Sequence, residues 1–312
     1  MINQNEISYI GIDVSKMTLD VFILPAKKYL QFTNDCKGIE KLVKKLSLFP
    51  QPHIVFEATG GYERPAAEAL TKSNFHVSIS NPRQVRDFAK GFGKLAKTDK
   101  IDAEMIALFS EKVSPEMNVN CDPEQRKLAE YAARKQQLTK MIRMEKNRLE
   151  HADQDIKKCI IQVLKLLEKQ LEKIISLQQQ LINENNSYSR RNEILQSIKG
   201  VGPAVSSEII ANLPELGRLG RRQISALVGV APLNHDSGMM RGKRAVKGGR
   251  MSVRCMLYMA VVCGIRYNPV IKSMYERLRS AGKLVKVAMT ACMRKLLIIM
   301  NAMIKNDEVW NS

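Results

Sequence analysis

Residues 7–112 alternate between apolar runs and amphipathic stretches, a pattern typical of strands interleaved with helices. YIGIDVSKMTLDVFIL predicts two strands around a turn near Ser15–Met17, and YLQFT predicts a third strand. An amphipathic stretch over residues 38–48 follows, then the strand HIVFEA, a helix over about 63–72, the strand FHVSIS and the helical segment KTDKIDAEMIALFSEK. Elements in this order predict an α/β layer fold.

Residues 124–199 contain no Gly or Pro, which is typical of long helices. Their apolar residues follow a 4–3 spacing with Gln170 at the one polar position, and the predicted seam consists of Ile156, Ile160, Val163, Leu167, Ile174, Leu177 and Leu181. This pattern predicts a coiled coil or a long helical hairpin, and we expect it to hold two or more chains together. A helical layer packed on its own domain is the alternative. The stretch NENNSYSR predicts a loop after the seam.

Residues 191–312 predict a mainly helical domain with Gly-rich interruptions. The last apolar segment, KLVKVAMTACMRKLLIIMNAMI, contains lysines and an arginine, so we expect a core helix and not a membrane span. The chain therefore divides into an α/β domain over 1–120, a helical coiled-coil region over 121–190 and a basic helical domain over 191–312. The N-terminus lacks signal-peptide features and the six cysteines are scattered, which predicts reduced thiols and a cytoplasmic location.

The chain is strongly basic. Fifty Lys and Arg residues against 31 Asp and Glu give a formal net charge of +19, and residues 190–312 alone carry +14. An excess of this size indicates a polyanionic partner, either a nucleic acid or an anionic membrane face. Aromatic residues make up only 5% of the chain, so we expect backbone charge contacts to dominate over base stacking. The four histidines are dispersed, which argues against a His/Cys metal cluster.

Four acidic residues occupy informative positions. Asp13 lies in the apolar strand YIGIDV and Glu57 ends the apolar strand HIVFEA, where a carboxylate is costly unless a partner compensates it. Asp99 and Asp102 share one helix face, about 5–6 Å apart at Cβ. Carboxylates that converge bind a divalent cation, and oxygen-only ligands select Mg²⁺ or Mn²⁺. Taken singly, each acid has a structural alternative: Asp13 opens a turn, Glu57 caps the next helix, or Asp99 is an N-cap.

The order of these acids on strand, strand and helix resembles the RNase H-like nucleases of the Holliday-junction-resolvase type. More closely, the whole chain resembles the DEDD transposases of the insertion-sequence-110 family, the bridge-RNA-guided recombinases, which include the Piv-type DNA invertases. The matching stretches are GIDVSK, FEATGGYE, NPRQVRDFAKGFGKLAKTDKIDA, SIKGVGP, LVGVAPLNHDSG and GKRAVKGGRMSVRCMLY. The resemblance implies an RNase H-like (RuvC-like) N-terminal fold and a catalytic, metal-binding tetrad of Asp13, Glu57, Asp99 and Asp102.

Ser237 lies in the sequence HDSG, just before a basic, glycine-rich run. His235, Asp236 and Ser237 are consecutive and cannot form a hydrolase triad, whose members converge from separate parts of a fold. A Ser-Gly pair alone usually marks a turn. The family carries a nucleophilic serine at this Ser-Gly, so the resemblance implies that Ser237 is catalytic. A phosphoserine link to DNA conserves bond energy and suits strand exchange better than hydrolysis.

Two glycine-containing motifs predict phosphate contacts. IKGVGP fits an h-G-h-G turn, typical of a helix-hairpin-helix-like motif, which bares backbone N–H groups beside a helix N-terminus; a plain helix–helix turn is the alternative. RGKRAVKGGRMSVR (241–254) holds six basic residues and no acid, although a solvated loop has the same composition. The predicted nucleic-acid-binding residues are Lys199, Gly200, Gly202, Arg241, Lys243, Arg244, Lys247, Arg250 and Arg254.

Together with the resemblance, these features predict a DNA transposase or site-specific recombinase that uses Mg²⁺, or Mn²⁺, and the Ser237 hydroxyl. The resemblance further implies donor and target DNA as partners, a noncoding bridge RNA, no membrane, and a dimer or tetramer in which Ser237 of one subunit joins the acids of another. Two hypotheses stay open beside it: a junction nuclease that hydrolyses DNA with water, and a non-enzymatic basic coiled-coil nucleic-acid binder. Chelation separates the binder from both enzymes, and a covalent protein–DNA adduct separates the two enzymes.

Overall fold

The computed structural model describes residues 7–93, 98–117, 122–233, 236–237, 240–242 and 244–311. The chain groups into two compact units, Met1–Cys121 and Asp122–Ser312. Formal charge divides unevenly between them, with +2 in the first unit and +17 in the second. The helical region and the basic domain of the sequence prediction therefore fall within one unit, and this unit carries nearly all of the excess charge.

The first unit contains a five-stranded mixed sheet with the order β3-β2-β1-β4-β5. Its strands are β1 (Ser8–Val14), β2 (Thr18–Leu24), β3 (Lys28–Thr33), β4 (Pro52–Glu57) and β5 (His76–Ser80). The pairs β1–β2 and β2–β3 are antiparallel, whereas β1–β4 and β4–β5 are parallel. All five strands lie where the apolar runs of the sequence predict them.

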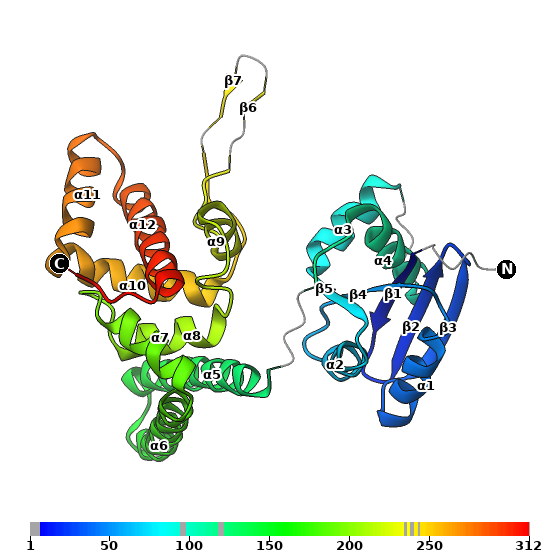
Figure 1. Ribbon diagram of the computed structural model, residues 1–312. Helices are drawn as coiled ribbons and strands as arrows, with labels where there is room; N and C mark the ends of the chain where they lie inside the picture. Colours follow the sequence, from blue (N-terminus) through cyan, green and yellow to red (C-terminus); the bar gives the residue numbers. More distant parts are fainter. Residues whose placement is uncertain are drawn as a thin grey trace. The chain divides into compact units, whose positions relative to one another are not determined.

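Helices cover both faces of this sheet (Figure 1). Helices α1 (Cys36–Leu46) and α2 (Arg64–Lys72) pack on one face over apolar residues such as Ile12 and Phe56. Helices α3 (Pro82–Gly91) and α4 (Asp99–Val113) pack on the other face, over Val55 and Phe22. The predicted α/β layer fold is thus confirmed, with α3 as a helix that the sequence pattern did not predict.

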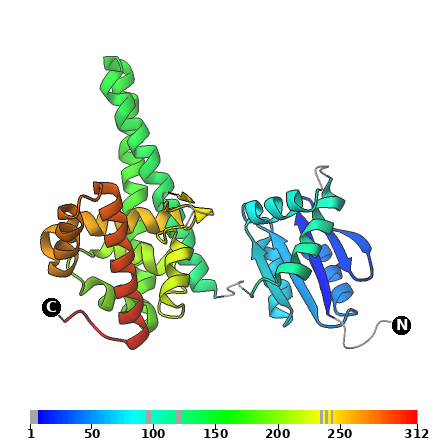
Figure 2. The ribbon, with the colours of Figure 1, turned by 90° about the horizontal axis from the view of Figure 1, so that it is seen from above.

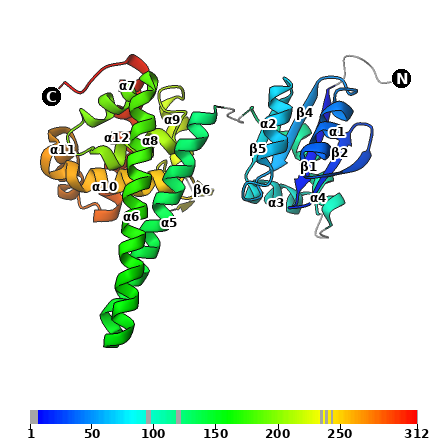
Figure 3. The same ribbon diagram turned by 90° about the horizontal axis from the view of Figure 1, so that it is seen from below.

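The second unit begins with a long antiparallel hairpin, α5 (Pro123–His151) and α6 (Gln154–Glu184), which extends beyond the other helices of its unit (Figures 2 and 3). The hairpin packs within one chain around Leu138, Ile142, Ile160, Leu164 and Leu167. The predicted seam is therefore wrong in part of its register. Leu164 and Leu171 face α5, whereas the predicted seam residue Val163 is 40% exposed and Ile156 is 57% exposed.

Six further helices and a small sheet complete the described part of the second unit. They are α7 (Asn186–Gln196), α8 (Pro203–Asn212), α9 (Arg221–Val228), α10 (Met251–Tyr267), α11 (Pro269–Ser280), α12 (Val285–Asn306), β6 (Asp236–Ser237) and β7 (Met240–Arg241). Leu128 and Ala132 of α5 belong to the same hydrophobic core as these helices. The loop predicted at NENNSYSR is wrong, because the break between α6 and α7 is confined to Asn185, whose side-chain Oδ1 accepts a hydrogen bond from the Tyr188 N–H.

Helix α12 is, among the described residues, the one helix whose length and apolar composition would suffice to cross a membrane. Half of its most apolar window is buried inside the protein. Cys292, Leu297 and Met300 have no exposed surface and pack into the core of the second unit. The helix therefore occupies the position of a core helix, as its lysines and arginine predict.

Candidate functional site

Asp13 and Glu57 lie side by side at the carboxyl ends of two parallel strands. Side chains alternate along β1, so Ile12 faces α1 and α2 while Gly11 and Asp13 face α4. The parallel register pairs Ile12 with Phe56, which places Asp13 next to Glu57 one residue further along. Both carboxylates thus leave the sheet on the face that α4 covers.

Gly11 allows α4 to lie directly on this face of the sheet. A Cβ atom on Gly11 would stand 2.2 Å from the Ala107 nitrogen and 2.3 Å from the Ala103 oxygen, both in the α4 backbone. No side chain fits into that space, so only glycine permits this approach. Asp99 lies one turn upstream of Ala103 in α4 and Asp102 immediately precedes it, so the close approach carries both carboxylates toward Asp13.

Asp99 and Asp102 occupy the first turn of α4, as the sequence predicts. Thr98 and not Asp99 is the N-cap, because the Thr98 Oγ1 accepts a hydrogen bond from the Ile101 N–H at 3.3 Å. Carboxylates in the first turn also interact favourably with the helix dipole, typically by 0.3–1 kcal/mol. The helix terminus thus stabilises two negative charges that stand near a third.

The electrostatic environment of Asp13 reflects this crowding of acids. The pKa of Asp13 is raised to about 6, mainly by burial and in addition by the negative charges of Asp102, Asp99 and Asp20. A hydrogen bond from the Val14 N–H to Asp13 Oδ1, 3.0 Å long, opposes the rise. Like charges this close disfavour the ionised form, which is the condition that a bound cation relieves.

Asp20 is an acid at this site that the sequence analysis missed. It pairs with Asp13 across β1 and β2 and is only 2% exposed. Its carboxylate accepts hydrogen bonds from Gln31 Nε2 at 2.8 Å, Thr18 Oγ1 at 3.1 Å and the Tyr29 hydroxyl at 2.5 Å. The bond to Asp20 is the main reason why the pKa of Tyr29 rises to about 12. The apolar run around it, TLDVFIL, carries the same signal that identified Asp13.

The donor set at this end of the sheet fits a hard divalent cation. Carboxylate oxygens are the ligands that Mg²⁺ and Mn²⁺ prefer, and the pKa of Asp13 is raised by burial and by the negative charges of its neighbours. Among the described residues, however, no group of three or more His, Cys, Asp or Glu side chains has the arrangement of a preformed metal site. The structure thus brings Asp13, Asp99 and Asp102 close enough for their charges to interact. Glu57 lies beside Asp13 on the neighbouring strand. The described side chains do not converge as tightly as the ligands of a preformed metal site.

Ser237 lies in β6, where it pairs with Met240 of β7. Its side chain is exposed, and the two short strands stand away from the helices of their unit (Figure 1). His235 and Gly238 lie outside the described residues. An exposed serine on a projecting hairpin is accessible to a large substrate such as a DNA duplex.

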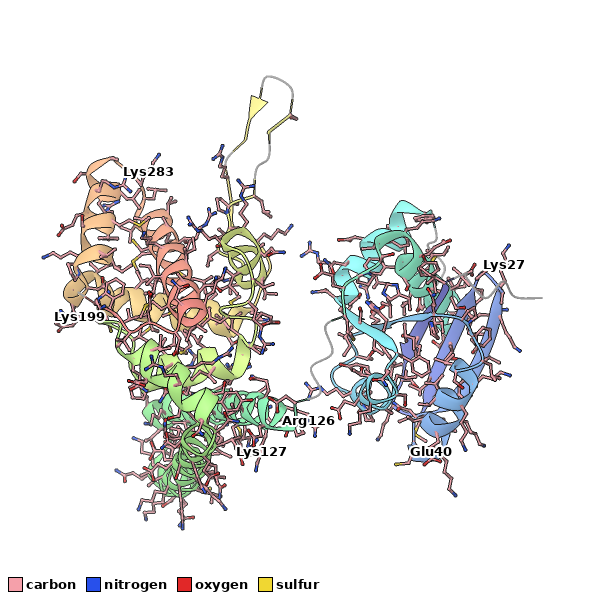
Figure 4. The ribbon with its side chains drawn as sticks, in the orientation of Figure 1. Lys27, Glu40, Arg126, Lys127, Lys199 and Lys283 are labelled. Carbon is pink, nitrogen blue, oxygen red and sulfur yellow. The ribbon has the colours of Figure 1, made fainter. Side chains whose placement is uncertain are left out.

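The turn between α7 and α8 carries the first group of predicted nucleic-acid-binding residues. Lys199 is exposed, and its side chain lies on the outside of the second unit, as does that of Lys283 (Figure 4). Gly200 adopts a left-handed φ of 101°, and a Cβ there would stand 2.9 Å from the Gly264 nitrogen of α10. Gly202 is the N-cap of α8 and has no heavy atom near its Cβ position, which leaves the start of that helix open.

The basic run 241–254 separates into two kinds of residue. Arg244 and Lys247 are exposed, whereas the Arg241 side chain and Lys243 lie outside the described residues. The Arg250 guanidinium binds both carboxylate oxygens of Glu215, at 2.5 and 2.6 Å, and donates to the Asn212 carbonyl. Arg254 donates to the carbonyls of Gly229 and Gly248. These two arginines therefore make internal contacts that the sequence does not reveal.

Comparison with known proteins agrees with this architecture. A family model described as a transposase of the DEDD type matches residues 10–155, which include all four acids. A second model, described as Transposase IS116/IS110/IS902 family, matches residues 192–276, which include Ser237. The chain belongs to the IS110 family of transposases. It is accordingly a DNA transposase or recombinase, and DNA is its substrate.

Two relatives align with this IS110-family chain over almost its whole length. The pilin gene-inverting proteins of Moraxella bovis and Moraxella lacunata are each 26% identical to it over 310 residues, which is 96% of this chain and 96% of each relative. An uncharacterized 42 kDa protein of the insertion element IS900 from Mycobacterium paratuberculosis is 28% identical over 137 residues, 42% of this chain and 34% of that protein.

Proposed function

We propose that this transposase exchanges DNA strands by a metal-dependent serine mechanism. Asp13, Glu57, Asp99 and Asp102 hold Mg²⁺ or Mn²⁺, and the Ser237 hydroxyl attacks the phosphodiester. The observation that carries this proposal is the contact of α4 with β1 across Gly11, which brings Asp102 and Asp99 close enough for their charges to add to burial in raising the pKa of Asp13. The mixed sheet, with acids at the ends of β1 and β4, is compatible with an RNase H-like fold.

The chemistry conserves phosphodiester energy. The Ser237 hydroxyl loses its proton as its oxygen forms a bond to phosphorus, the bond from phosphorus to one deoxyribose oxygen breaks, and that oxygen leaves as a hydroxyl after it takes up a proton. A deoxyribose hydroxyl of another strand then attacks the phosphoserine and releases Ser237. A bound divalent cation would offset the negative charge that develops on the phosphate during attack.

Binding of nucleic acid falls to the second unit in this proposal. Its charge of +17, with Lys199, Arg244 and Lys247 exposed, supports a grip on phosphate backbones. The family resemblance adds a noncoding bridge RNA that selects donor and target. It also adds a dimer or tetramer in which Ser237 of one subunit acts with the acids of another. The near full-length match to two proteins named for pilin gene inversion supports strand exchange over simple hydrolysis.

The decisive experiment removes one oxygen atom. Ser237→Ala should abolish recombination and any covalent protein–DNA adduct trapped by denaturation. Folding, Mn²⁺ binding and DNA affinity should stay unchanged, because Ser237 is exposed. Recombination at the wild-type rate by this variant would contradict the serine mechanism. Cleavage without an adduct, together with metal dependence, would instead favour the junction nuclease that uses water, and metal-independent binding without cleavage would favour the non-enzymatic binder.

A further inference from the structure

The described residues between α9 and α10 (230–233, 236–237, 240–242 and 244–247) form an arm, and Ser237 lies on it. Val230 is buried in the core of the second unit, but the described residues beyond it bury little surface, since Leu233 is 46% exposed and Val246 is 37% exposed. Leu233 and Ala245 are bridged, with the Leu233 N–H donating to the Ala245 carbonyl at 2.9 Å. An arm with so little packing must take its direction from the place where it joins the helices.

The two ends of the arm meet backbone to backbone. Gly229 ends α9 and Gly249 precedes α10, and both have left-handed φ angles, 78° and 75°. A Cβ on Gly249 would stand 2.3 Å from the Gly229 nitrogen, and a Cβ on Gly229 would stand 2.2 Å from the Gly248 oxygen. Each position therefore requires glycine twice, for its φ angle and for the approach of the other strand of chain.

The first turn of α10 holds this junction closed. The Arg254 Nη1 donates to the carbonyls of Gly229 and Gly248, one from each end of the arm. The Arg250 N–H donates to the Leu227 carbonyl at 3.2 Å, which ties the start of α10 to the last turn of α9. We call Gly229, Gly248, Gly249 and Arg254 the clasp. Both bonds come from Nη1, whose two N–H groups are held in the plane of the guanidinium fork, whereas the three N–H groups of a lysine ammonium rotate freely.

We propose that the clasp positions Ser237 for attack, and that Arg254 is a positioning residue rather than a phosphate contact. This role rests on the proposed function of Ser237 as the nucleophile. The clasp is the point at which both ends of the arm are fixed to the helical body, so a shift there moves the two starting points of the segment that carries Ser237. A misplacement of about 1 Å at a reacting atom can cost on the order of 10²-fold in rate.

Two glycines of the clasp provide a matched pair of substitutions. Gly248 and Gly249 have nearly the same φ, 72° and 75°, so Ala imposes the same backbone strain at either position. A Cβ on Gly248 meets nothing within 4 Å, whereas a Cβ on Gly249 collides with the Gly229 backbone. A difference in rate between the Gly248→Ala and Gly249→Ala variants therefore reports the opening of the clasp, because the strain from the left-handed φ angle is present in both variants.

The experiment measures adduct formation in a single turnover at saturating DNA, together with the DNA Kd and its salt dependence. For Gly249→Ala we expect adduct formation at least ~10-fold slower than for Gly248→Ala, with equal Kd values. Arg254→Lys keeps the charge but loses the fork, and should slow adduct formation in the same way with an unchanged salt slope. Equal rates for the two glycine variants, or an Arg254→Lys variant with the wild-type rate, would overturn the positioning role.

A phosphate contact at Arg254 predicts a different pattern. In that case Arg254→Met would weaken the Kd and lower the log–log salt slope by about 0.9, while Arg254→Lys would behave as the wild type. The Ser237→Ala variant distinguishes a failure of the proposed nucleophile from a failure of the proposed role of the clasp. If that variant recombines normally, the proposed nucleophile is wrong; if it is inactive while Gly249→Ala matches Gly248→Ala, only the clasp is wrong.

Discussion

Asp13 and Asp20 oppose each other across the antiparallel strands β1 and β2. Asp20 is fixed by hydrogen bonds from Thr18, Tyr29 and Gln31, and its charge adds to those of Asp102 and Asp99 on Asp13. Like charges directly opposite in a sheet are destabilising. The first unit therefore maintains an arrangement that costs stability, and it does so where the proposed metal would bind.

This cost predicts a pH-dependent effect of Asp13→Asn in metal-free protein. The pKa of Asp13 is about 6 in the folded chain and about 3.9 when unfolded, so the folded state binds the proton more tightly. Stability is therefore lost as pH rises from about 4 to about 6. Asn avoids this loss and should stabilise the protein by about 1–2 kcal/mol at pH 7.5 after solvent screening, but not at pH 4. Urea unfolding at both pH values measures the effect, and an equal gain at both would contradict it.

Gly11→Ala should separate α4 from the sheet. The added Cβ meets the α4 backbone at 2.2 Å, so we expect a loss of about 3 kcal/mol in unfolding free energy and a large fall in Mn²⁺ affinity. Gly91→Ala in the last turn of α3 is the control, because its Cβ meets nothing within 4 Å. Chemical denaturation and calorimetry of Mn²⁺ binding report the two effects. Normal Mn²⁺ binding by Gly11→Ala would contradict the claim that the contact between α4 and β1 positions the metal-binding acids.

Asp99→Asn should lose metal-dependent cleavage while it keeps its fold. The substitution removes a like charge near Asp13, which offsets the loss of ~0.3–1 kcal/mol of helix-dipole stabilisation at the start of α4. Glu111→Gln removes a charge from the far end of the same helix and should cleave normally. DNA cleavage assays with Mg²⁺ and Mn²⁺, beside thermal unfolding, make the comparison. Wild-type cleavage by Asp99→Asn would remove Asp99 from the metal assignment.

The sequence predicted the secondary-structure positions of the four candidate acids, but not the contacts that depend on the tertiary fold. Strand and helix positions of Asp13, Glu57, Asp99 and Asp102 follow from local periodicity, and the structure has them as predicted. Asp20 was missed although its strand was predicted, because its significance depends on which residue of β1 it pairs with. Arg250 and Arg254 lie in a run that reads as a phosphate-binding loop, and only tertiary contacts reveal that Glu215 and Gly229 occupy their guanidinium groups.

The predicted register of the α5–α6 hairpin was wrong in part, because it also depends on tertiary contacts. Val163 and Leu164 are both apolar, and so are Leu166 and Leu167, so a 4–3 spacing can be drawn through either set. The choice between them depends on the side from which α5 approaches, which is a property of the folded unit and not of the local pattern. Leu164 and Leu167 face α5, whereas Leu166 is 59% exposed.

Substitutions on the two sides of α6 should therefore differ. Leu167→Ala should cost about 2–3 kcal/mol of unfolding free energy, because the side chain is 7% exposed and packs within the hairpin. Leu166→Asn should change stability by less than ~0.5 kcal/mol. If the exposed side of the hairpin joins subunits, Leu166→Asn should also lower the solution mass measured by light scattering. An unchanged mass would exclude Leu166 from the contact between subunits.

Salt dependence should separate the basic residues of the second unit. Lys199→Met and Arg244→Met should each lower the log–log salt slope of DNA binding by about 0.9, because both side chains are exposed. Arg250→Met should leave the slope unchanged and instead destabilise the protein by about 2 kcal/mol, because it strips Glu215 of its partner. Fluorescence anisotropy at several salt concentrations tests all three. A lower slope for Arg250→Met would place that residue on the DNA.

The meeting of Gly229 and Gly249 also bears on how these proteins can diversify. Because the two ends of the arm touch, the helices α9 and α10 are connected as if by a short turn, and the segment between them is an insertion in the architectural sense. Each doubling in the length of such a segment costs only about 0.6 kcal/mol of closure entropy. The folding stability of the helical scaffold should therefore tolerate changes in the length of this insertion, even where strand exchange does not, and a laboratory graft at these two glycines should leave the scaffold folded.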